Sequence, residues 1–143
     1  MVRGGLARGT LVLDADGFTK LAKKDVVARS YYQAALDEKS LVVTAASTLA
    51  EVLRGGRADV PVHRVLKKVE VVGIDPGHGR AAGELLGRLG LSGHRHAMDA
   101  LLAVVALAQP RPVVVLTSDP RDLAVLTDEP YRPRSERVKI VKI

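Results

Sequence analysis

The sequence predicts a single α/β domain, built on a parallel β-sheet of four to five strands with helices on both faces. Its 143 residues fit one domain with a core that buries most of the apolar surface. Short runs of Val, Leu and Ile that do not alternate with polar residues are typical of strands covered on both faces. Segments with the apolar spacing of helices separate these runs, and this alternation indicates βαβ units.

The composition narrows the class of protein. Hydrophobic residues make up 47% and charged residues 27%, as in an ordinary soluble domain. No cysteine is present, which excludes disulfides, thiolate zinc sites and cysteine nucleophiles, and suits the cytoplasm, where we expect the protein. The longest apolar run, residues 100–108, is far shorter than the roughly 20 residues that span a bilayer, so no membrane association is expected.

The net charge of +6 leaves two interpretations open. A positive surface favours an anionic partner such as nucleic acid, because basic side chains neutralise phosphates and release counterions. Equally, many basic domains are merely kept soluble by their charge. Acidic residues at recurrent positions are therefore more informative than the net charge.

A short N-terminal segment precedes the first expected strand. Residues 1–9 are basic and Gly-rich, and we expect a flexible lead-in to a domain that spans residues 10–143. The apolar run Thr10–Leu13 predicts the first strand. Helical spacing then extends over residues 15–38, and the polar residues 23–25 divide it into two helices.

The second strand is expected over residues 41–43, and Thr44 closes it and begins a helix over residues 45–54. Gly55 and Gly56 stand where a C-terminal glycine cap is usual. A capping box could instead include Glu51, but that leaves barely two turns. A start at Thr44 places Glu51 in the middle of the helix.

The middle of the chain continues the alternation. A shorter helix over residues 61–68 has proline at a permitted early position. Residues 69–74 form the third expected strand. A glycine-weakened helix over residues 77–89 then stops at Gly90.

The last third contains the most apolar helix of the chain. Residues 92–96 lead into this helix, which is expected over residues 97–108, and the fourth strand follows over residues 113–116. A short helix over residues 120–126 comes next. After a proline-containing loop, residues 136–143 are expected to add a fifth, basic edge strand.

Four carboxylates occupy positions that can converge on one edge of this sheet. Asp14 ends the first strand and Asp119 follows the fourth, while Glu51 and Asp99 lie in helices next to the second and fourth strands. Sites in such sheets form beyond the carboxyl ends of the strands, where the strand order reverses. Four carboxylates form an oxygen-only ligand set that suits Mg²⁺ or Mn²⁺ rather than zinc.

Each carboxylate also has a purely structural interpretation. Asp119 precedes Pro120 and Asp122, a pattern that favours a helix N-cap, and Asp14 could equally be a cap. A mid-helix glutamate is usually just solvated. Asp99 is harder to dismiss, because eleven of the twelve residues 97–108 are apolar. A buried carboxylate without a partner costs several kcal/mol or shifts its pKa.

Four segments of the chain resemble the motifs of a PIN domain. They are LVLDADGF, VVTAASTLAEVLRG, HAMDALLAVVAL and VVVLTSDPRDL, in the order and approximate spacing of that family, and they cover the chain from Leu11 to Leu126. The closest resemblance is to the VapC-type toxin ribonucleases of toxin–antitoxin pairs.

This resemblance implies a metal-dependent endoribonuclease that cuts RNA with a Mg²⁺ or Mn²⁺ centre. It also implies a cognate antitoxin as partner and a homodimer. The acidic residues that match the family's centre, both catalytic and metal-binding, are Asp14, Glu51, Asp99 and Asp119, with Asp122 matching a further acid often present.

One position departs from the family pattern. The first acidic residue is usually followed by small or hydroxylic residues, whereas this chain has Ala15 and Asp16. Asp16 either adds negative charge near the metal or points away from it as a helix-start acid. The second is favoured, because acids are common in the first turn of helices.

Other polar residues near this edge could contact substrate. Thr117 and Ser118 could meet a metal-bound water or cap the next helix, and we favour capping. Arginines could hold the flanking phosphates, although each alone is more typical of a solvated side chain. These arginines are Arg54, Arg57, Arg95 and Arg121.

The histidines do not predict a zinc site. His94 and His96 are two residues apart, which suits a loop or strand chelate but not one face of a helix. No third nitrogen or sulfur ligand stands at a suggestive spacing.

Two alternative functions remain open. The chain could be a receiver-like signalling module, in which Asp14 and Asp16 hold a metal, Asp75 accepts phosphate and Thr117 or Ser118 responds. That hypothesis leaves Glu51 and Asp99 unexplained. The chain could also be a PIN-like domain that binds RNA without cutting it.

Overall fold

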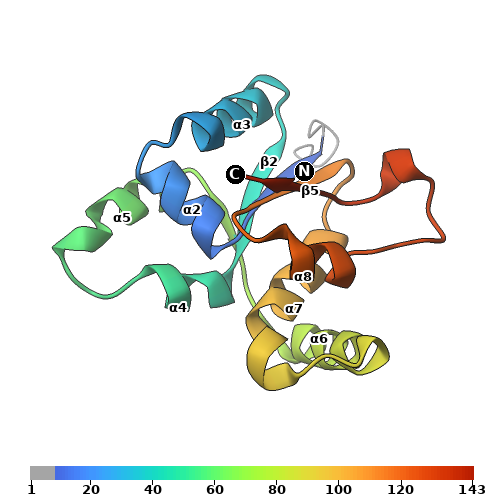
Figure 1. Cartoon of the computed structure of the whole chain (residues 1–143). Helices are drawn as coiled ribbons and strands as arrows, with labels where there is room; N and C mark the ends of the chain where they lie inside the picture. Colours follow the sequence, from blue (N-terminus) through green and yellow to red (C-terminus); the bar gives the residue numbers. More distant parts are fainter. Residues whose placement is uncertain (1–8) are drawn as a thin grey trace.

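A computed structural model describes residues 9–143, so residues 1–8 of the expected lead-in lie outside the described part (Figure 1). Five strands form one all-parallel sheet in the order β3-β2-β1-β4-β5. The strands are β1 (Thr10–Leu13), β2 (Leu41–Ala45), β3 (Glu70–Val72), β4 (Val113–Thr117) and β5 (Lys139–Lys142). The predicted α/β class, the parallel sheet and the basic fifth strand at an edge are confirmed.

Helices cover both faces of the sheet, as predicted (Figure 1). The α-helices are α2 (Ala15–Ala22), α3 (Val26–Asp37), α4 (Leu49–Val52), α5 (Val60–Leu66), α6 (Pro76–Leu89), α7 (Gly93–Leu107) and α8 (Pro120–Leu126). Short 3₁₀ turns are η1 (Ala46–Thr48), η2 (Arg57–Asp59) and η3 (Arg134–Glu136). None of the helices in residues 9–143 has the length and apolar character needed to cross a membrane.

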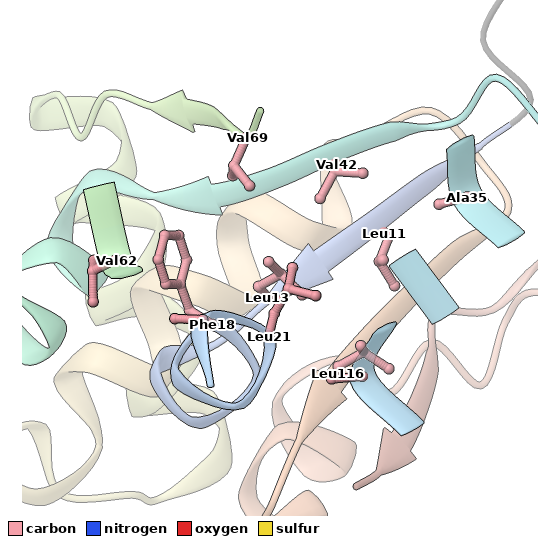
Figure 2. Packing of buried hydrophobic residues seen from close by; sticks show 11 residues of the cluster. Leu11, Leu13, Phe18, Leu21, Ala35, Val42, Val62, Val69 and Leu116 are labelled. Carbon is pink, nitrogen blue, oxygen red and sulfur yellow. The ribbon is translucent and has the colours of Figure 1, made fainter. Parts of the chain in front are cut away.

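Helices α2, α3 and α5 pack on one face of the sheet. Figure 2 shows Phe18 of α2 beside Leu13 of β1, with Val62 of α5 nearby. The Phe18 side chain is 0% exposed, and burying a side chain of this kind stabilises the fold by about 1.5–3 kcal/mol. The helix that begins right after β1 is therefore anchored firmly to the sheet.

Helix α7 packs on the opposite face. Its Leu102 and Val105 meet Val12 of β1 and Val115 of β4 in a second apolar cluster. Helix α6 packs against the outer side of α7, away from the sheet (Figure 1). Since its outer side is also covered, α7 is buried on most sides, which accounts for its apolar sequence.

The order in which strands are added to the sheet reverses at β1. It runs from β1 to β2 and β3 on one side and then crosses to β4 on the other, so the switch point lies between β1 and β4. Leu13 and Leu116 are paired in register, which brings the residues that follow them side by side. A Cβ on Gly17 would lie 2.6 Å from the carbonyl oxygen of Leu116, so only glycine lets α2 approach β4 this closely.

Several element boundaries differ from those expected, and two of these differences affect the site. Thr44 does not begin a helix: it lies in β2, and its hydroxyl donates to the carbonyl of Leu13 at 2.7 Å. The helical segment after β2 therefore starts later and is shorter than predicted. Helix α7 starts at Gly93, four residues earlier than expected, with Ser92 at its N-cap position. His96 consequently lies on this helix, one turn before Asp99.

Candidate metal centre

The four predicted carboxylates line one cavity of about 120 Å³ at the carboxyl ends of β1 and β4. They come from four different elements of the chain, as the sheet argument anticipated. Asp16 adds a fifth carboxylate. The polar residues around the cavity are Asp14, Asp16, Thr48, Glu51, Asp99, Thr117 and Asp119.

Asp14 holds the first position and is also a helix cap. It directly follows β1, and its Oδ1 accepts a hydrogen bond from the backbone N–H of Gly17 at 2.7 Å. The cap uses one of the two carboxylate oxygens. Capping and metal binding are therefore compatible for this residue.

Asp119 occupies the N-cap position of α8 but makes no side-chain capping bond, so the capping interpretation was wrong. Its own backbone N–H donates to Thr117 Oγ1 at 3.1 Å, which turns the chain sharply after β4. Thr117 and Ser118 do not cap α8 either. The exposed carboxylate of Asp119 lies 3.5 Å from Nε of Arg121.

Asp99 and Glu51 reach the cavity from helices α7 and α4. Asp99 is half-buried on α7, whereas Glu51 on α4 is exposed at the rim. Buried neighbours on the sheet side fix α7 tightly, so the position of Asp99 is the more rigid of the two.

The two inner carboxyl groups are electrostatically strained. Burial raises the pKa of Asp14, and the charges of Asp16 and Asp99 raise it further, against hydrogen bonds from Thr117 and Gly17. Burial also raises the pKa of Asp99, followed by the charges of Asp122 and Asp119, while His96 acts in the opposite direction. Both groups therefore lack sufficient positive partners.

The pKa of Glu51 is raised by partial burial and then by the charges of Asp99 and Asp14. Because Glu51 is exposed, water screens the repulsion at this carboxylate more than at Asp14 and Asp99. No Lys, Arg or His lines the cavity within residues 9–143. A divalent cation would relieve this repulsion, and the donor set of carboxylate and hydroxyl oxygens fits Mg²⁺ or Mn²⁺.

Asp16 does not point away from the site, contrary to the favoured interpretation. It lines the same cavity, and the Ser118 hydroxyl donates to its Oδ2. The close approach of α2 to β4 turns the first turn of α2 toward the site. Asp16 thus adds negative charge to the centre.

Asp122 lies beside the cavity together with a residue that the sequence analysis missed. His96, Asp99 and Asp122 each offer one ligand atom, and these atoms lie within 4.8 Å of one another. His96 was missed because the helix was expected to begin after it. The spacing His96-x-x-Asp99 is the signal that could have found it, since residues three apart share a helix face.

The predicted phosphate-binding arginines lie outside the cavity. Arg54 donates to the carbonyls of Ala50 and Leu53 at the end of α4, and Arg95 is exposed in the first turn of α7. Arg121 contacts one residue of the cavity lining, Asp119. Contact of these residues with RNA stays a prediction.

The strand order contradicts the receiver-like alternative. Strand β2 separates β3 from β1, so Asp75 is not brought to Asp14 and Asp16. Asp75 instead caps α6, accepting a hydrogen bond from the backbone N–H of His78 at 3.0 Å.

Comparison with known proteins identifies the fold. No protein-family model matches this chain, and no curated protein sequence does. Among solved structures it is similar to a chain in the crystal structure of VapBC2 from Rickettsia felis bound to a DNA fragment from their promoter. The TM-score is 0.65, with 15% sequence identity, over 93% of this chain and 99% of that chain. The PIN-like fold implied by the resemblance is confirmed, and at this identity the likeness extends to the fold alone.

Proposed function

We propose, from this fold and its acidic cavity, that the chain is a metal-dependent endoribonuclease and the toxin of a type II toxin–antitoxin pair. The observation that carries the proposal is the convergence of five carboxylates, without a basic neighbour in the lining, at the switch point of the sheet. The similarity to a VapBC2 chain and the net charge of +6 support it.

In this proposal, the residues that hold Mg²⁺ or Mn²⁺ are Asp14, Glu51, Asp99 and Asp119. When bound, a divalent cation lowers the pKa of a coordinated water and stabilises negative charge on a phosphate. Thr117 positions the Asp119 carboxylate. Its hydroxyl oxygen accepts a hydrogen bond from the backbone N–H of Asp119 and fixes the turn that carries this side chain.

The size of the cavity defines how RNA reaches the centre. The cavity of about 120 Å³ has room for a cation and ordered waters, and it is smaller than ordinary ligand pockets of about 300–1,000 Å³. The scissile phosphate must therefore approach from the open side, where Glu51 and Asp119 form the exposed rim. The basic surface elsewhere on the chain would hold the flanking phosphates.

Cleavage of RNA by the purified protein tests this proposal. Asp14→Asn and Asp99→Asn should each lower the cleavage rate at least about 100-fold, equivalent to roughly 3 kcal/mol of transition-state stabilisation. Asp37→Asn is the matched control, because Asp37 is exposed on α3, accepts a hydrogen bond from Gln33 and does not line the cavity. Circular dichroism checks that all variants fold.

Full activity in both site variants would contradict the proposal. RNA binding that persists without cleavage under any divalent cation would instead support a PIN-like RNA-binding domain. A short adjacent reading frame encoding a DNA-binding protein would be strong independent support for the toxin role.

A groove on the α2–α3–α5 face is the surface that best fits the antitoxin partner. Its volume is about 420 Å³. Its lining combines the apolar residues Leu21, Ala22, Leu36, Pro61 and Val65 with the basic residues Lys24, Arg29, Arg64 and Lys68. An apolar floor with a basic rim complements an amphipathic, acidic segment of the partner.

Co-purification with the product of the adjacent reading frame tests this surface. Arg29→Glu combined with Arg64→Glu should weaken the complex, whereas Arg88→Glu on the exposed side of α6 should not. Equal binding by both would remove the groove from the proposal. The homodimer is a separate expectation, which light scattering of the purified protein measures.

A further inference from the structure

We propose that His96, Asp99 and Asp122 form a second metal position, next to the carboxylate cavity, which selects a first-row transition ion such as Mn²⁺ over Mg²⁺. It rests on the proposed function in one respect, because Asp99 belongs to both positions. It adds a nitrogen donor that no residue of the cavity provides.

The spacing of the ligand atoms suits a small cation. His96 Nδ1 lies 3.5 Å from Asp122 Oδ2. Ligands at about 2.0–2.3 Å from a shared cation are about 3.0–3.7 Å apart when they are neighbours in the coordination shell. One ligand atom from Asp99 lies within 4.8 Å of both, so a small side-chain rotation completes the set.

His96 Nδ1 is also a buried polar atom without a hydrogen-bond partner among residues 9–143. Leaving such an atom unsatisfied destabilises the folded state, because its hydration is lost and not replaced. An Nδ1–H that donated to Asp122 would be expected at about 2.7–2.9 Å, well inside the observed 3.5 Å. A cation between the two atoms accounts for both the distance and the missing partner.

The three side chains stand on rigid elements. His96 and Asp99 share one face of α7, and Asp122 lies in the first turn of α8. Leu126 of α8 is buried against Ala100 and Ala103 of α7, which fixes the two helices relative to each other. The His96 side chain is only 15% exposed, so its ring is held near Asp122.

The donor chemistry gives the selectivity. Imidazole nitrogen is a poor ligand for Mg²⁺, which prefers oxygen, whereas affinities of mixed nitrogen and oxygen sites rise along the first-row transition series. Two carboxylates and one imidazole therefore favour a transition ion at this position, while the cavity with oxygen donors alone accepts either metal.

Pulsed electron paramagnetic resonance of the Mn²⁺-loaded protein tests the proposal without reference to cleavage. A coordinated imidazole imposes ¹⁴N modulation on the Mn²⁺ signal. We expect this modulation in the unmodified chain, its loss in His96→Gln, and its retention in His94→Gln, the matched control at an exposed position of the same helix.

A competition titration gives a second measurement. The preference for Mn²⁺ over Mg²⁺ should fall at least about tenfold in His96→Gln, since even loss of a ligand's hydrogen-bond partner commonly has that effect. Asp122→Asn should weaken Mn²⁺ binding to a similar extent. Circular dichroism confirms that each variant folds, and His96→Asn replaces His96→Gln if the latter does not.

The outcomes separate this proposal from the proposed function. If Mn²⁺ binds the unmodified chain without ¹⁴N modulation, or if the modulation survives in His96→Gln, the second position is overturned while the carboxylate centre stands. If no divalent cation binds the unmodified chain, both proposals fall.

Discussion

Carboxylates at the two ends of the parallel strands have opposite electrostatic environments: one end pairs its carboxylate with arginines, and the other groups several carboxylates together. Near the amino end of β4, Glu129 is only 5% exposed. It accepts hydrogen bonds from Arg111, which precedes β4, at 2.7 Å and from Arg132 at 3.0 Å. Burial alone would raise the pKa of Glu129, but the bond and charge of Arg111 lower it below its usual value. After β1 and β4 end, burial and like charges raise the pKa values of Asp14 and Asp99.

This difference separates a structural carboxylate from the carboxylates of the proposed metal centre. Glu129 joins the loop after α8 to the start of β4 and holds the fold together. In the acidic cavity the like charges repel one another, and the raised pKa values of Asp14 and Asp99 follow in part from this repulsion. Groups kept at such a cost are typical of functional sites.

Breaking the Glu129 network should have the largest effect on stability. Glu129→Gln removes the charge that neutralises Arg111, whose side chain is only 20% exposed. Losing one partner of a buried ion pair typically costs about 3–5 kcal/mol in the free energy of unfolding. Urea denaturation measures it, with the exposed neighbour Asp128→Asn as a control expected to change by less than about 0.5 kcal/mol. A loss no larger than the control's would remove the contrast between the two ends.

Divalent cations should stabilise the acidic end by a somewhat smaller amount. Ligand at about 100 times its dissociation constant adds about 2.7 kcal/mol to the free energy of unfolding. Thermal unfolding of the chain with Mn²⁺ and with a chelator measures this gain. Asp99→Asn should lose most of it and Asp37→Asn should keep it. An equal gain in Asp99→Asn would show that the cation binds elsewhere.

Removing a charge from the metal-free site should have the smallest effect, and of opposite sign to the Glu129 change. Asp99→Asn is expected to stabilise the chelated protein at pH 7 by roughly 0.5–2 kcal/mol, as is common when a functional-site residue is replaced. Because the pKa of Asp99 is raised in the folded state, that state holds its proton longer than the unfolded chain, and wild-type stability falls as pH rises through the raised pKa.

The pH dependence provides the check. The advantage of Asp99→Asn over the unmodified chain should shrink as the pH falls through the raised pKa of Asp99 toward the ordinary Asp pKa of about 3.9, since Asp99 in the folded state is then protonated and carries no charge. Denaturation curves at several pH values, all with chelator, measure it. A constant difference across this range would mean that repulsion at Asp99 is not its source.

The sheet and the four main carboxylates could be predicted from the sequence for a simple reason. Strands of Val and Leu end abruptly at Asp14 and just before Asp119, and the parallel arrangement brings those ends to one edge. The start of α7 was not predicted, because Gly93 and His94 have low helix propensity and, being exposed, show no apolar pattern that marks a helix.

The positions of Asp16 and His96 at the site depend on contacts between elements that are distant in the sequence. Asp16 turns inward because Gly17 lets α2 touch β4, a contact between residues about 100 positions apart. His96 is a neighbour of Asp122 because α7 packs against α8. Local pattern says nothing about either contact.

The central position of β1 in the sheet also affects the order in which the fold can form during synthesis. Its partner β4 is made late, and Asp119 follows still later, so the earliest strand waits for its second neighbour through most of synthesis. A nascent chain on the ribosome carries Asp14 and Glu51 without Asp99 and Asp119. Such a chain has no complete acidic centre until nearly the whole domain has emerged.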